Sequence, residues 1–115
     1  MNMYVQDVTS SRKFLDRNIE EVENTIKRDM SVDSSHIYYY FGVSEEFPQF
    51  FLLIYMYRDK KPIRELIKVK NSGLYFHDQQ FSNARDLIAW FKEHLKEKEY
   101  QKYAKNMAIQ MQKMK

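Results

Sequence analysis

Between residues 18 and 30, the apolar positions of the chain recur at steps of three and four. These positions are Ile19, Val22, Ile26 and Met30. Because each residue of an α-helix turns the chain by about 100°, the four side chains would share one face. Asn18 stands just before them, and asparagine is a favoured N-cap residue. The pattern predicts a helix over residues 18–30.

Two runs of aromatic and β-branched residues follow this helix. Residues 37–43 and 50–57 are rich in Tyr, Phe and Ile, which favour β-strands. The six residues between the runs include Pro48, which is typical of a connection and not of a central strand. The two runs therefore predict an antiparallel hairpin.

A third strand is expected over residues 63–69. Alternation along a strand places every second side chain on the same face. One face would then carry Arg64, Leu66, Lys68 and Lys70. Asn71-Ser72-Gly73 is a turn signal, so residues 74–76 are expected to return as a short fourth strand.

Helical spacing returns in the last third of the chain. Ser82 is expected to cap a helix over residues 83–96, since apolar residues between 84 and 95 fall on one face. A second stripe, over residues 98–112, predicts an amphipathic helix. Its members are Tyr100, Tyr103, Met107 and Met111. This helix needs a partner surface, on this domain, on a neighbouring domain or on a second copy, and a frayed extension is the alternative.

The order of these elements predicts an α+β domain. Its central antiparallel sheet would be flanked by helices on opposite faces, with a helical tail at the C-terminus. We expect residues 1–15 to be a linker from a preceding domain, with a short helical turn possible there. Residues 16–96 would be the domain, and residues 97–115 an amphipathic basic helix or tail.

Composition removes several function classes. The chain has no cysteine, which excludes disulfides and thiol chemistry and fits a reducing intracellular compartment. Its two glycines form no phosphate-binding loop, and its three histidines are isolated. We therefore expect no catalytic residues, no metal site and no cofactor. No apolar run approaches the roughly 20 residues that a membrane span needs, so no membrane partner is expected.

Residues 81–94, which begin Phe-Ser-Asn-Ala-Arg and end Trp-Phe-Lys-Glu-His, resemble the last helix of Src-homology-2 (SH2) domains. Residues 39–44 fall where this family has its Phe-Leu-Val-Arg-Glu-Ser strand, and residues 68–76 match its later strand–turn–strand unit. The resemblance implies an SH2-like fold and a non-catalytic binding module.

A narrower resemblance covers about residues 4–96. It is to the second domain of the tandem SH2 pair that ends a transcription elongation factor and histone chaperone. The resemblance implies a nuclear protein. Its implied partners are the neighbouring SH2 domain and a phosphorylated linker of the largest subunit of RNA polymerase II.

One departure from the family concerns phosphotyrosine. The family's phosphate-binding arginine falls here on Gly42, or on Val43 if the alignment slips by one residue. Neither residue can supply the guanidinium fork that pairs with a phosphate. We therefore expect a degenerate phosphotyrosine pocket at Gly42 and no tight binding of isolated phosphotyrosine peptides.

The candidate phosphate contacts are therefore other basic residues. The first set is Arg64, Lys68 and Lys70, on one face of the third strand; the others are Arg17, Arg12, Lys13 and Lys92. Two alternatives stay open. One is a purely structural half of the tandem pair that binds no phosphate. The other, less favoured, is a nucleic-acid-binding module that uses the basic tail, since residues 92–115 hold seven lysines and three glutamates.

Overall fold

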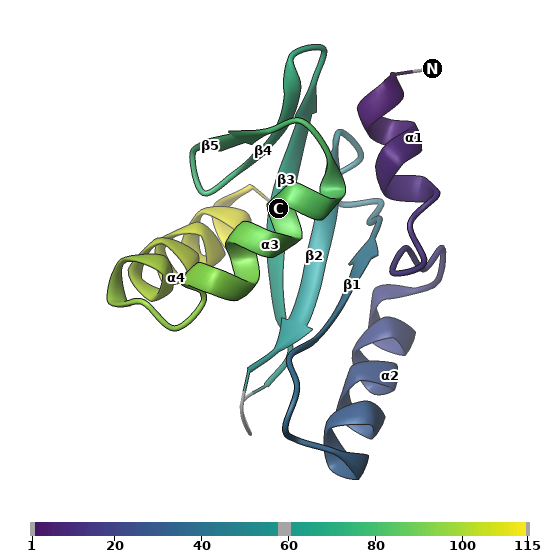
Figure 1. Ribbon diagram of the computed structural model, residues 1–115, viewed down its shortest axis with the longest axis vertical. Helices are drawn as coiled ribbons and strands as arrows, with labels where there is room; N and C mark the ends of the chain where they lie inside the picture. Colours follow the sequence, from purple (N-terminus) through teal and green to yellow (C-terminus); the bar gives the residue numbers. More distant parts are fainter. Residues whose placement is uncertain (1, 58–60, 115) are drawn as a thin grey trace.

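The computed structural model describes residues 2–57 and 61–114 and contains four helices and five strands within them (Figure 1). The helices are α1 (Met3–Thr9), α2 (Ile19–Val32), α3 (Ala84–His94) and α4 (Lys98–Lys113). The strands are β1 (Tyr38–Gly42), β2 (Phe50–Met56), β3 (Ile63–Lys70), β4 (Gly73–Phe76) and β5 (Gln79–Phe81). The α+β class predicted from the sequence is confirmed, and β5 is an additional short strand.

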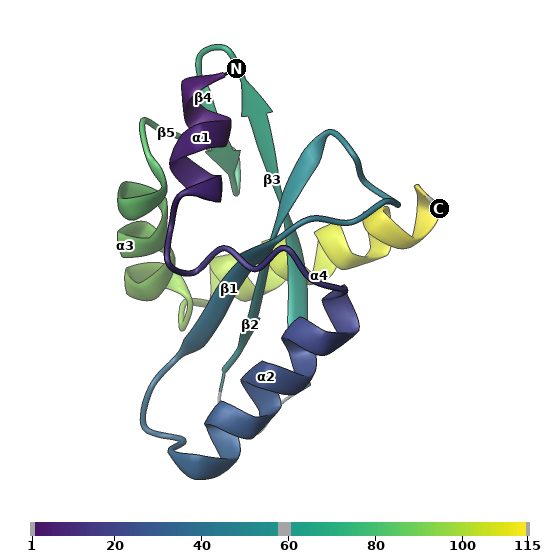
Figure 2. The same ribbon diagram turned by 90° about the vertical axis from the view of Figure 1, so that its right-hand side faces the viewer.

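The strands form one antiparallel sheet in the order β1-β2-β3-β4-β5. Helix α2 covers one face, while α1 and α3 cover the other, as the two perpendicular views show (Figures 1 and 2). The predicted placement of two helices on opposite faces is therefore confirmed.

Strand alternation on β2 separates two apolar cores. Leu53 and Tyr55 pack toward α3, whereas Leu52 and Ile54 pack toward α2. All four side chains are fully or almost fully buried. Burying a large apolar side chain contributes about 1.5–3 kcal/mol, so packing on both faces makes β2 the centre of the fold.

The N-terminal segment is more ordered than a linker would be. Val8 of α1 is buried, and the Asp7 carboxylate accepts a hydrogen bond of 2.6 Å from the backbone N–H of Ala84 at the start of α3. Farther along, the chain around Phe14 pairs in parallel with Phe41 at the edge of β1. Residues 3–9 therefore form a helix packed on the domain, while the expected boundaries at 15 and 96 stay predictions.

The N-cap residue of α2 is the one predicted from the sequence, whereas the N-cap residue of α3 is a different one. The Asn18 side chain accepts the Glu20 N–H at 2.8 Å, as expected for the N-cap of α2. At α3 the cap is Asn83, whose side chain accepts the Asp86 N–H at 2.7 Å, so the expectation of Ser82 was wrong. Asn83 has the extended backbone that an N-cap residue adopts.

Helix α4 docks on this domain. Strand β4 pairs only with the last three residues of β3, so residues 63–67 would otherwise leave a free sheet edge. Helix α4 contacts β3 there and runs from the α3 side of the sheet to the α2 side (Figure 2). Tyr100 packs into the first core and Met111 into the second. The predicted helix is confirmed, and its partner surface is this domain.

A buried acid joins α4 to the sheet. Glu65 of β3 is 3% exposed, and its Oε2 accepts hydrogen bonds from the hydroxyls of Tyr55 at 2.6 Å and Tyr100 at 2.5 Å. Its Oε1 lies 2.6 Å from Nε2 of His77. The His77 ring also stacks on Tyr100 and Tyr103, with centroid distances of 3.9 and 4.2 Å. We call Glu65, His77, Tyr55 and Tyr100 the Glu65 cluster.

Stability should fall as pH rises above about 10, the usual tyrosine pKa. Burial, followed by the charge of Glu65, raises the pKa of Tyr55 and of Tyr100, and burial raises the pKa of Tyr103 to about 12. The unfolded chain then releases tyrosine protons that the folded chain keeps, so stability is full below pH 10 and is lost above it. Tyr55 and Tyr100 each contribute a slope of up to about 1.4 kcal/mol per pH unit, and the more exposed Tyr103 contributes less because solvent screens it. Urea denaturation at several alkaline pH values measures the slope, and a flat profile would contradict the raised pKa values.

Candidate phosphate-binding site

Gly42 lies on the α2 face of the sheet, where apolar side chains close over it. A Cβ atom at this position would stand 2.9 Å from Cδ1 of Ile54 and 3.2 Å from Cδ1 of Ile19. The residue itself is buried. The position onto which the sequence resemblance first places the family's phosphate-binding arginine is therefore packed with hydrocarbon.

Gly42→Arg should lower the free energy of unfolding by about 1–3 kcal/mol, because a long side chain must displace packed core atoms. Gly42→Ala is the matched control and should lose less, since only the two terminal methyl groups of Ile54 and Ile19 need to shift. Chemical denaturation measures both losses. An arginine variant that stayed as stable as the parent and gained phosphotyrosine binding would show that a usable pocket exists here.

Strand β3 carries the predicted basic face, but one of its cations, Arg64, is already paired with an acid. Arg64, Lys68 and Lys70 are all exposed, as alternation requires. The Arg64 guanidinium donates two hydrogen bonds to the Glu23 carboxylate on α2, at 2.8 and 3.0 Å. The hydrogen bond to Glu23 is also the main cause that raises the pKa of Arg64. The ammonium group of Lys70 lies 4.9 Å from the ring centroid of Tyr75. Arg64 therefore ties α2 to the sheet and is not a free phosphate contact.

Arg12 and Arg17 lie on the exposed chain that leads into α2. Burial is the main cause that raises the pKa of the Tyr40 hydroxyl. The charge of Arg17 acts in the opposite direction and lowers that pKa, so Arg17 lies near Tyr40. The Tyr40 hydroxyl donates to the Asp29 carboxylate at 3.2 Å. Arg17 therefore stands beside a tyrosine and an acid, away from the α3 face.

The structure brings two of the weaker candidates together. The ammonium groups of Lys13 and Lys92 lie 5.2 and 5.4 Å from the ring centroid of Tyr39. The three residues come from three segments: the chain before α2, the middle of β1 and the end of α3. Tyr39 is half-buried, and burial raises the pKa of its hydroxyl, which keeps the ring neutral. We call Lys13, Lys92 and Tyr39 the lysine pair site.

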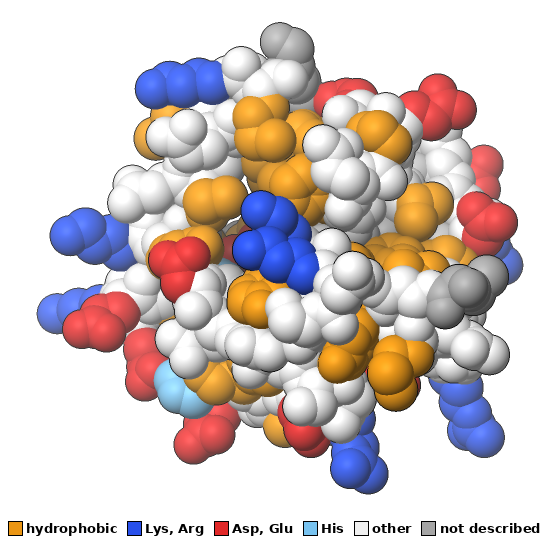
Figure 3. Space-filling view, turned by 90° about the horizontal axis from the view of Figure 1, so that it is seen from above, with side chains coloured by type: hydrophobic (Ala, Val, Ile, Leu, Met, Phe, Trp, Pro, Cys, Tyr) orange, Lys and Arg blue, Asp and Glu red, His pale blue; other side chains and the backbone are white. Residues whose placement is uncertain are grey.

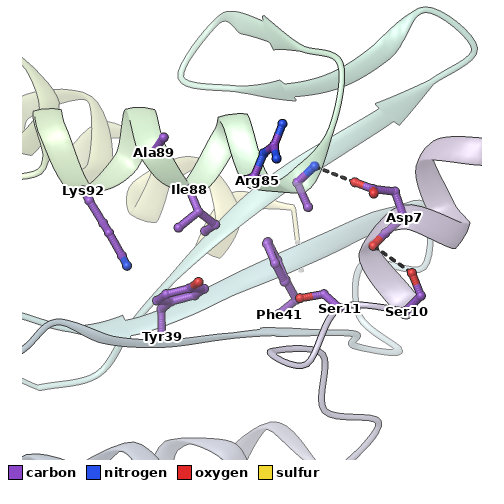
Figure 4. Close-up of a pocket in the computed structure, with 10 residues that line it drawn as sticks. Asp7, Ser10, Ser11, Tyr39, Phe41, Arg85, Ile88, Ala89 and Lys92 are labelled. Atoms are coloured by element: carbon purple, nitrogen blue, oxygen red, sulfur yellow. Dashed lines mark hydrogen bonds between the residues drawn. The ribbon is translucent and has the colours of Figure 1, made fainter.

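A cleft of about 580 Å³ opens beside this site, between α1, β1 and α3 (Figure 4). Tyr39 and Phe41 form its floor, and Lys92 reaches into it from α3. Ser10, Ser11 and Arg85 also line it. Asp7, an acid that also lines the cleft, accepts a hydrogen bond from the backbone N–H of Ala84. Two ammonium groups, an arginine and two hydroxyls can therefore receive an anionic group such as a phosphate.

Sequence reasoning undervalued this site because its parts are far apart along the chain. Lys13 and Lys92 come together only when the Phe14 segment pairs with β1 and α3 packs on the same face. Tyr39 belongs to a run of strand-forming aromatic residues, and Arg85 and the two serines carried no signal of their own. Only the basic character of positions 13 and 92 was available from sequence.

The described residues show no metal centre. Within 2–57 and 61–114, no three His, Asp or Glu side chains come together as metal ligands would. No helix in the same ranges is long and apolar enough to cross a membrane.

Comparisons with known proteins agree with this architecture. The SH2 domain family model matches residues 1–94. A transcription elongation factor SPT6-like protein of Arabidopsis thaliana is 29% identical over 92 residues, which are 80% of this chain and 7% of that protein. Transcription elongation factor SPT6 of Drosophila melanogaster is 34% identical over 80 residues, 69% of this chain and 4% of its own length. The chain thus spans only a small part of these relatives.

Two solved structures have the same fold. The tandem SH2 domain of transcription elongation factor Spt6, which binds the phosphorylated C-terminal repeat domain of RNA polymerase II, superposes with a TM-score of 0.75 and 25% identity. The match covers 82% of this chain and 49% of that one. The tandem SH2 domains of Antonospora locustae Spt6 give a TM-score of 0.65 at 20% identity, over 78% of this chain and 47% of theirs. From the family match, the relatives and the shared fold, we conclude that the chain belongs to the SH2 domain family.

Proposed function

We propose that this chain is a non-catalytic phosphoprotein-binding module and that the phosphate binds at the lysine pair site. The observation that carries the proposal is that the ammonium groups of Lys13 and Lys92 both lie over the ring of Tyr39, and that Tyr39 and Lys92 line a cleft. A dianion bound beside this ring would be attracted by both ammonium groups. The site lies on the α3 face of the sheet, opposite the packed Gly42 position.

The other basic residues support the proposal less well. Arg64 is engaged by Glu23, and Lys70 lies over Tyr75. Lys68 is exposed on the β3 face. A single exposed ion pair contributes only about 0.2–1 kcal/mol, so separate surface lysines bind phosphate weakly. The lysine pair site adds a second cation and a partly enclosed cleft.

The partner we propose is a phosphorylated segment of the largest subunit of RNA polymerase II. The tandem SH2 domain of Spt6, about half of which this chain matches, binds the phosphorylated C-terminal repeat domain of that polymerase. The narrower resemblance of the sequence favours the phosphorylated linker of that subunit. We further propose that the chain is the second half of a tandem pair in a nuclear elongation factor that is also a histone chaperone. Linkage to the first half would then raise the effective concentration of a weakly bound phosphate.

The test is a titration of this chain with matched linker and repeat peptides, each with and without its phosphate. Phosphate-dependent binding of either peptide supports the module, and the tighter peptide identifies the segment. Equal binding of phosphorylated and unphosphorylated forms would favour the purely structural half.

A nucleic-acid-binding function remains the alternative, and charge distribution bears on it. In the space-filling view, Lys and Arg side chains stand at separate points around the rim and at the centre of the face (Figure 3). A surface that binds the phosphate backbone of a nucleic acid gathers its Lys and Arg side chains in one patch or stripe. Oligonucleotide binding with a steep salt dependence, and no need for phosphopeptide, would favour this alternative.

A further inference from the structure

A second hollow adjoins the lysine pair site. It has a volume of about 430 Å³ and is lined by residues of the α2–β1 connection and of the end of α3. Lys92 lines both hollows, and Lys96 lines only the second. The two hollows therefore meet at Lys92.

The charges around the second hollow favour an anion at its α3 end. Lys92 and Lys96 are both exposed, and His36 and Ser34 line the hollow opposite them. Two acids are next to lining residues. Asp33 accepts two hydrogen bonds from Ser35, at 2.9 and 2.6 Å, and lies 3.5 Å from His36, while Glu97 lies 3.9 Å from Nε2 of His94. Each of these acids is thus engaged by a neighbour on its own segment.

The spacing of the two lysines matches an extended ligand. Lys92 lies in the last turn of α3, and Lys96 lies in the turn just after the helix. Leu95, the residue before Lys96, keeps helical backbone angles, so the backbones of the two lysines are about one helical turn, roughly 6 Å, apart along the axis. In an extended peptide, side chains two residues apart point the same way and are separated by about 6.6 Å. A ligand that lies along α3 with its phosphate at Lys92 would place the side chain two positions away at Lys96.

From these observations we infer that the module reads two anionic groups in one extended segment. The first is the phosphate at the lysine pair site, and the second is an acidic or phosphorylated residue two positions away, bound between Lys92 and Lys96. This inference rests on the proposed function and adds a specificity to it: an i, i+2 arrangement of negative charge.

The test uses this chain and three peptides with one phosphoserine in an otherwise neutral extended sequence. The first has alanine at positions −2 and +2, the second has aspartate at −2, and the third has aspartate at +2. One of the two aspartate peptides should bind about 2- to 5-fold more tightly than the alanine peptide at low salt, since the added ion pair is exposed. The preferred peptide identifies the direction in which the ligand runs.

Lys96→Ala should remove this gain and leave the affinity for the alanine peptide unchanged. Lys98→Ala, a change of the same charge at an exposed position two residues away, is the control and should keep the gain. A gain that survives in Lys96→Ala, or no gain with either aspartate, overturns the inference alone. An alanine peptide that binds equally well without its phosphate overturns the proposed function, and the inference with it.

Discussion

Replacing Glu65 with alanine should lower the free energy of unfolding by about 3–5 kcal/mol, the usual loss when one partner of a buried charged network is removed. The substitution leaves the hydroxyls of Tyr55 and Tyr100 and the Nε2 of His77 without their shared acceptor, and all three residues are buried. It also removes a hydrogen bond that joins α4 to β3. Urea denaturation followed by fluorescence reports on the change directly, because Trp90, the only tryptophan, lies 5.4 Å from His77 and 5.8 Å from Tyr100 between ring centroids.

Glu93→Ala is the matched control, since Glu93 is an exposed acid on α3. Its loss should be within about 0.5 kcal/mol, as for ordinary surface substitutions. Glu65→Gln should fall between the two, because its amide oxygen still accepts a hydrogen bond but carries no charge. Equal stabilities for Glu65→Ala and Glu93→Ala would mean that the Glu65 cluster does not hold α4 on the sheet.

Lys13→Glu combined with Lys92→Glu should weaken binding of a phosphorylated polymerase peptide by about 10- to 100-fold at low salt. Hydrogen bonds to charged groups contribute about 1.5–3 kcal/mol, and exposure to solvent reduces that amount for these two side chains. The reversal also places two carboxylates beside the incoming phosphate. Calorimetric titration of both proteins with the same peptide measures the ratio, and circular dichroism checks the fold.

Lys68→Glu combined with Lys70→Glu is the control for this variant. It makes the same change of net charge on the opposite, α2, face of the sheet and leaves the Arg64–Glu23 pair intact. A loss of affinity as large as that of the Lys13 and Lys92 variant would mean that overall charge, or the β3 face, governs binding. We expect the affinity of this control variant to fall by less than about 5-fold.

The sequence predicts the fold of this protein well because its signals are local and periodic. The apolar stripe from Ile19 to Met30 and the alternation in β3 each depend on one element, and both are found in the structure. The cap of α3 was misplaced by one residue because Ser82 and Asn83 are both good capping residues, and only the backbone conformation separates them. Helix α1 carried too weak a pattern, since Val8 is its one buried residue.

The candidate site was much harder to predict than the fold. Lys13 and Lys92 meet through a parallel bridge at Phe14 and through the packing of α3, and neither event has a local signature. The acid at position 65 carries no signal of its own in the sequence. Its partners Tyr55, His77 and Tyr100 come from three other parts of the chain, so a buried cluster of this kind becomes visible only in three dimensions.

The central claim is that the phosphate binds on the α3 face, at the lysine pair site. The most direct measurement is a nuclear magnetic resonance titration of the isotope-labelled chain with a singly phosphorylated polymerase peptide, with the unphosphorylated peptide as reference. The account predicts that the phosphate-dependent shifts gather at the amides of Lys13, Tyr39 and Lys92 and leave those of Lys68 and Gly42 unchanged. Phosphate-dependent shifts centred on Lys68 or Gly42, with none at Tyr39, would contradict it.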